Sequence, residues 1–117
     1  MDREELKRRT KKFALRVMKM TDALPRTVKG KIIAGQILRA ATGLASGYRA
    51  ACRARSRADW NDKIGRTLEE ADESLLWLEL IEEDGLLPAR RVAPLKQEAH
   101  ELTAIFSSIH KTSKSEE

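Results

Sequence analysis

Apolar residues recur at helical spacing in four successive stretches of the chain. Steps of three, four or seven residues separate them, which is the period of a helix that buries one face. Only 4% of the residues are aromatic, and alanine, leucine, glutamate, lysine and arginine are frequent, which favours helices over strands. The pattern predicts an all-α chain with helices at about residues 3–23, 27–54, 57–84 and 90–111.

Proline, serine and glycine mark the ends of these helices. Pro25 interrupts the chain after the first helix, because the residue before a proline avoids the helical conformation. Ser56 is placed to cap the third helix, and Gly85 is placed to end it. Residues 112–117 are polar, and we expect this tail to fray. Four helices with short turns predict one domain over residues 1–117, folded as an antiparallel up-down-up-down four-helix bundle.

The second predicted helix has two different faces. Ile33, Ile37 and Leu44 belong to a conventional core stripe. The opposite face consists mainly of glycine, alanine and serine, and it needs a closely approaching partner helix, from the same chain or from another copy. The third helix carries apolar residues outside its core stripe, whereas a lone amphipathic helix has one stripe. We therefore expect self-association, with candidate interface residues Gly35, Arg39, Gly43, Ser46, Gly47, Ala50, Arg53, Leu76, Trp77 and Leu80.

Charge is divided between the second and third helices. Between Arg26 and Arg57 there are eight basic residues and no acid, whereas residues 58–84 hold ten acids and two basic residues. In one interpretation, Arg39 and Arg53 neutralise these acids within or between subunits, because the arginine fork pairs bidentately with a carboxylate. In the other, the basic face of the second helix and the N-terminal basic run bind nucleic-acid phosphate. The candidate phosphate-binding residues are Lys29, Lys31, Arg49, Arg55 and Arg57.

Residues for catalysis or metal binding are sparse. The net charge of +5 suits nucleic acid or an acidic partner, but equally an ordinary surface. The single cysteine, Cys52, rules out an internal disulfide and a cysteine-cluster metal site. Neither His100 nor His110 has a glutamate three residues before it, as a carboxylate-bridged metal site in a bundle requires. We therefore expect no catalytic residue, no metal, no cofactor and no enzymatic activity.

The hydropathy of the chain bears on its location. No apolar run approaches the ~20 residues that a membrane-spanning helix needs. The charged N-terminal run MDREELKRRTKK is not followed by the apolar region of a secretory signal. We therefore expect a cytoplasmic protein without a membrane partner.

Two long runs resemble a known bacterial family. They are Thr42–Ser56, reading TGLASGYRAACRARS, and Glu69–Ile81, reading EEADESLLWLELI. Both resemble the "four helix bundle protein" family, which is related to the S23 proteins encoded in intervening sequences of 23S ribosomal RNA genes. The family pattern usually has serine where this chain has Gly43 and asparagine where it has Gly47. The remaining matches are Phe13-Ala-Leu-Arg-Val17, Leu24-Pro25, Gln36 and Arg39.

The resemblance implies an antiparallel four-helix bundle that assembles into a ring-like homopentamer. More distant relatives include an accessory factor of diversity-generating retroelements, which is similar in fold, is basic, and binds nucleic acid and a reverse transcriptase. The leading hypothesis is a non-enzymatic homo-oligomer that binds RNA or DNA through the basic residues of its second helix. The alternative is a protein–protein interaction module, such as an accessory ring for a polymerase or reverse transcriptase, without direct nucleic-acid binding.

Overall fold

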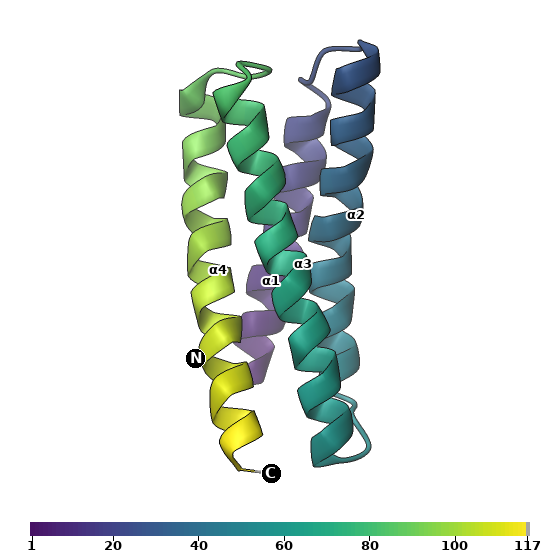
Figure 1. Ribbon diagram of the computed structural model, residues 1–117, viewed down its shortest axis with the longest axis vertical. Helices are drawn as coiled ribbons and strands as arrows, with labels where there is room; N and C mark the ends of the chain where they lie inside the picture. Colours follow the sequence, from purple (N-terminus) through teal and green to yellow (C-terminus); the bar gives the residue numbers. More distant parts are fainter. Residues whose placement is uncertain (117) are drawn as a thin grey trace.

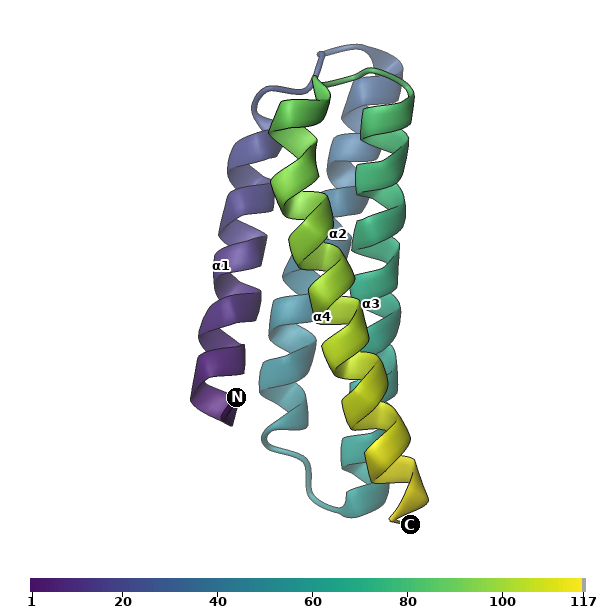
Figure 2. The ribbon, with the colours of Figure 1, turned by 90° about the vertical axis from the view of Figure 1, so that its left-hand side faces the viewer.

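Four α-helices make up the fold in the computed structural model, which describes residues 1–116. They are α1 (Arg3–Thr21), α2 (Val28–Ala51), α3 (Arg57–Glu83) and α4 (Ala89–Ser115), and no strand occurs among the described residues. The helices lie side by side along the long axis of a molecule that measures 46 × 21 × 20 Å (Figure 1). Their three connections lie alternately at opposite ends (Figure 2). The prediction of an all-α chain with four helices is confirmed.

Local capping determines where three of the helices begin. The side chains of Asp2, Thr27 and Ser56 each accept a hydrogen bond from the backbone N–H three residues later, at 2.8, 3.1 and 3.0 Å. Each bond satisfies one of the backbone donors that the first turn of a helix leaves without a partner. After α3, Gly85 has a φ of +71°, a conformation that favours glycine and ends the helix.

The structure corrects two predicted boundaries. Helix α2 ends at Ala51 rather than at 54, because the backbone N–H groups of Arg53 and Ala54 bond three residues back and tighten the last turn. Helix α4 continues to Ser115 rather than ending at 111, so residues 112–115 of the predicted tail are helical. The reason is Ser113, which is buried and whose hydroxyl donates a hydrogen bond to the side-chain carbonyl of Asn61 on α3. The predicted tail also included residue 117, which lies outside the described residues.

All four helices contribute to one hydrophobic core. Phe13 of α1, Ile37 of α2, Leu78 of α3 and Phe106 of α4 are fully buried. The ring of Phe106 meets Tyr48 edge-on, with ring centroids 5.4 Å apart. Burying one such apolar side chain contributes about 1.5–3 kcal/mol. The core stripes read from the sequence therefore hold the helices together and leave the polar faces at the surface.

Candidate nucleic-acid and oligomer surfaces

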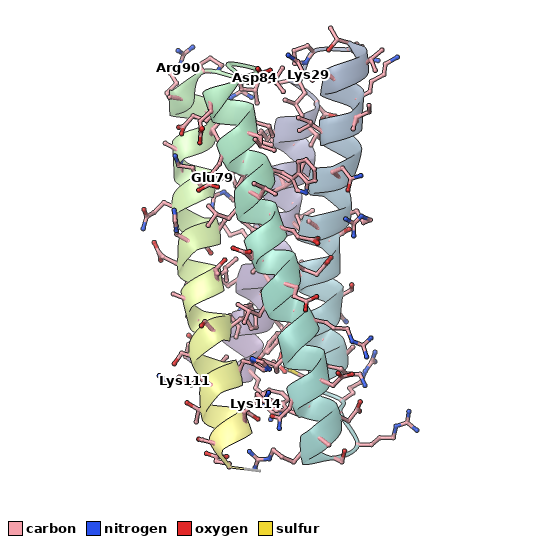
Figure 3. All side chains as sticks on the ribbon, in the orientation of Figure 1. Lys29, Glu79, Asp84, Arg90, Lys111 and Lys114 are labelled. Atoms are coloured by element: carbon pink, nitrogen blue, oxygen red, sulfur yellow. The ribbon has the colours of Figure 1, made fainter. Side chains whose placement is uncertain are left out.

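Two of the five predicted phosphate-binding residues contact acids of the same chain. Lys29 Nζ lies 2.7 Å from Asp84 Oδ2, and Figure 3 shows these residues at the same end of the molecule, from α2 and from the end of α3. Arg57, the first residue of α3, forms an ion pair with Glu116 beyond the end of α4. Both ion pairs are exposed, so each contributes little free energy to folding. They nevertheless reduce the charge that Lys29 and Arg57 offer to a ligand.

The other three predicted residues present their charge to solvent. Lys31 lies in the first turn of α2, Arg49 in its last turn, and Arg55 in the connection to α3. All three are exposed, and none of their side chains forms an ion pair within residues 1–116. Cations therefore remain available at both ends of α2.

Helix α1 carries the N-terminal basic run, which the phosphate-binding interpretation includes although none of its residues is among the five candidates. Seven basic residues and no acid occur from Lys7 to Lys19, and this composition indicates a basic helix from the sequence alone. Lys7 forms an ion pair with Glu4, and Arg9 forms one with Glu98. In the described part of the chain, the exposed basic residues of this run that form no ion pair are Arg8, Lys11, Lys12 and Lys19.

Arg39 joins α2 to the acidic helix α3 of its own chain. Its guanidinium nitrogens lie 4.0 Å from Glu70 Oε1 and 3.6 Å from Glu73 Oε2. Burial and the nearby Glu73 carboxylate raise the pKa of Glu70 above its ordinary value, although Arg39 acts in the opposite direction. Arg53 is exposed and has no acid partner between residues 1 and 116. Pairing between α2 and α3 within one chain therefore accounts for Arg39 but not for Arg53.

The small-residue face of α2 is divided between two environments. A Cβ atom added to Gly43 would lie 2.1 Å from Glu70 Oε2, and one added to Gly47 would lie 3.0 Å from Thr67 Oγ1. For these two glycines the partner helix is α3 of the same chain. A Cβ atom on Gly35 would have no atom of another helix within 4 Å. The exposed remainder of this face, with Gly35 and Ser46, is open to another partner, and Ala50 is half-buried.

Large apolar side chains are exposed along the outer side of the α2–α3 contact. Ile32 of α2 is 59% exposed, and Leu76 and Leu80 of α3 are 46% and 38% exposed. In the sequence, Ile32 lies between Lys29 and Arg39. The two leucines lie between Glu73, which pairs with Arg39, and Asp84, which pairs with Lys29. The ion pairs therefore place the apolar residues along the same stretch of the contact. We call Val28, Ile32, Leu76 and Leu80 the apolar seam surface.

Trp77 lies partly buried beside this surface. Its indole Nε1 is buried and has no hydrogen-bond partner among the described residues. A buried donor without a partner is costly.

The structure offers little chemistry beyond binding. Cys52 is free and half-buried. The pKa of Tyr48 is raised, chiefly by burial and also by its hydrogen bond with Cys52. Among residues 1–116, no three histidine, cysteine, aspartate or glutamate side chains are grouped to hold a metal ion. None of the four described helices combines the length and apolar character required to cross a membrane.

Comparisons with known proteins are consistent with this architecture. A solved structure from Bacteroides thetaiotaomicron, described as a protein of unknown function from the S23 ribosomal protein family, superposes with a TM-score of 0.83. It is 30% identical and covers 90% of this chain and 97% of its own. No curated protein matches the chain. The family model for the 23S rRNA-intervening sequence protein matches residues 4–108. The resemblance read from the sequence is therefore confirmed, and the chain belongs to the 23S rRNA-intervening sequence protein family.

Proposed function

We propose that this protein is a cytoplasmic, non-enzymatic homo-oligomer that binds RNA or DNA. The observation that carries the proposal is the set of exposed cations at both ends of α2, a helix without any acid. Lys31, Arg49 and Arg55 are its leading phosphate ligands, because they lack intrachain ion pairs within residues 1–116. Lysine and arginine contacts to phosphate supply most of the affinity in binding that is independent of sequence.

The proposed protomer is an antiparallel up-down-up-down bundle, and the assembly is a ring of five copies. The apolar seam surface supports self-association, because several large apolar side chains are exposed next to one another and gain free energy when a second copy covers them. The exposed residues Gly35 and Ser46 allow close approach beside it. A ring places many copies of the α2 cations on one particle, which raises affinity for a long polyanion through multivalency.

Fluorescence anisotropy with labelled structured RNA tests the proposal. For about five phosphate contacts, a salt slope of about 0.9 per contact predicts roughly 500-fold weaker binding when the salt concentration rises from about 50 to 200 mM. Replacing both Lys31 and Arg49 with glutamine should flatten that slope by nearly two units. Absence of binding at about 50 mM salt, with protein shown by light scattering to be oligomeric, would refute the proposal.

The alternative function is a protein–protein interaction module, and the apolar seam surface favours it. In that case the ring serves as an accessory to a polymerase or reverse transcriptase and does not touch nucleic acid itself. Its association with such an enzyme would survive nuclease treatment. If nuclease releases the enzyme, RNA is the bridge and the alternative fails.

A further inference from the structure

Opposite charges face each other across most contacts between helices. Arg39 faces Glu73 between α2 and α3, and Lys96 pairs with Glu82 between α3 and α4. Toward the N-terminal end of α1, Arg9 pairs with α4 through Glu98 and Glu101. Charge complementarity across neighbouring helices is therefore the general rule in this bundle.

The other half of the α1–α4 contact breaks this rule. Arg16 and Lys19 of α1, with Arg90 and Arg91 of α4, line a groove of about 340 Å³. Figure 2 looks onto these two helices side by side, and Figure 3 shows Arg90 at the end of α4 that carries the α3–α4 connection. We call this the α1–α4 basic groove. No acid lines it, and none of its four cations forms an ion pair with any described residue.

Four cations around one groove repel one another, and solvent and salt only partly screen that repulsion. An anion placed among them turns the repulsion into attraction. The groove also has apolar lining, supplied by Met20, Pro94 and Leu95. Cations combined with an apolar lining suit a ligand that presents both negative charge and flat or apolar groups.

We infer that the α1–α4 basic groove binds the phosphodiester backbone of a nucleic-acid strand. This inference rests on the proposed function and adds a second set of phosphate ligands to those of α2. Three of the four cations are arginines, whose planar fork matches phosphate bidentately. A strand carries one negative charge per nucleotide, so it supplies several charges to one groove, and its sugars and bases can cover the apolar lining.

The test compares two double variants of the full chain that lose the same charges. Lys19→Gln with Arg91→Gln removes one lysine and one arginine from the groove. Lys111→Gln with Lys114→Gln removes two positive charges from exposed positions of α4 outside the groove. Figure 3 shows Lys111 near the end of the molecule opposite to Arg90. The probe is a labelled single-stranded oligouridylate of roughly 20 nucleotides, and its affinity is measured across a salt series by anisotropy.

Loss of two phosphate contacts should flatten the salt slope by about 1.4, because each contact to a single strand contributes about 0.7. That change corresponds to about 25-fold weaker binding at 0.1 M salt, if the affinities of the variant and the wild-type protein become equal near 1 M salt. The control pair should weaken binding by less than about threefold, because charges beyond a Debye length are largely screened. Without RNA, the groove variant should also melt at a higher temperature than the control variant, because it loses like-charge repulsion.

The possible results separate the inference from the proposed function. If wild-type protein binds and both double variants weaken binding equally, the groove is not a binding site, although nucleic-acid binding stands. If wild-type protein does not bind RNA at about 50 mM salt, both proposals fall. If poly-glutamate of equal charge competes as well as oligouridylate, and depends equally on Lys19 and Arg91, the groove receives an acidic protein segment and the nucleic-acid assignment is wrong.

Discussion

Replacing Arg9 with methionine should loosen the contact between α1 and α4. Arg9 Nε and Nη2 donate hydrogen bonds of 2.7 and 2.8 Å to the two carboxylate oxygens of Glu98, and Nη2 also donates one of 2.7 Å to Glu101. The side chains of Arg9 and Glu98 are only 26% and 16% exposed. The pKa of Arg9 is raised further above its ordinary value, chiefly by the hydrogen bonds with Glu98. Methionine keeps the apolar stem and removes the charge and all three bonds.

The size of the effect follows from the two bonds to Glu98. A hydrogen bond to a charged group contributes about 1.5–3 kcal/mol when buried, and partial exposure reduces the pair to about 2 kcal/mol in total. For a chain of 117 residues, the entropy of unfolding is about 0.25 kcal/mol/K. The midpoint of thermal unfolding, Tm, should therefore fall by about 8 °C.

Circular dichroism melting at neutral pH and one fixed protein concentration measures this shift, since oligomerisation makes Tm depend on concentration. Arg8→Met is the matched control, because Arg8 is exposed and forms no ion pair within residues 1–116, and its Tm should change by less than about 2 °C. A double-mutant cycle with Glu98→Gln isolates the pair. If Arg9→Met melts like Arg8→Met, or if the coupling free energy is near zero, the ion pair does not stabilise the α1–α4 contact.

Three further predictions test other parts of the structure. The pKa of Glu70 is raised in the folded protein, so ionised Glu70 lowers stability as pH rises above the ordinary glutamate value of 4.5. Glu70→Gln should therefore raise Tm at pH 7 and lose that advantage at about pH 4; a lower Tm at pH 7 would contradict this. Ser113→Ala should leave Asn61 unbonded and lower Tm by about 4–8 °C, whereas an equal shift in the exposed control Ser115→Ala would argue against that anchor. Leu80→Glu should lower the particle mass by light scattering while helicity is retained, and an unchanged mass would exclude the apolar seam surface from the assembly.

The helices and their ends were largely predictable from the sequence. Apolar spacing and capping residues act within a few positions of one another, so Ser56 and Gly85 mark the ends of α3 without any tertiary information. The family was also readable from two long runs, and the family model confirms it over residues 4–108. The end of α4 was missed, because the bond of Ser113 reaches Asn61, 52 positions away in the chain.

The surface residues available for binding were decided by the tertiary structure. The sequence grouped the cations of α2 together, but the packing of α2 on α3 pairs Lys29 with Asp84 and leaves Lys31 exposed. Likewise, only the packing of α1 against α4 brings Arg16 and Arg91 to one groove. Periodicity reports which face of a helix is apolar, but not the rotation and stagger of one helix against the next. Those two quantities determine which charges meet, and core packing along the whole bundle sets them.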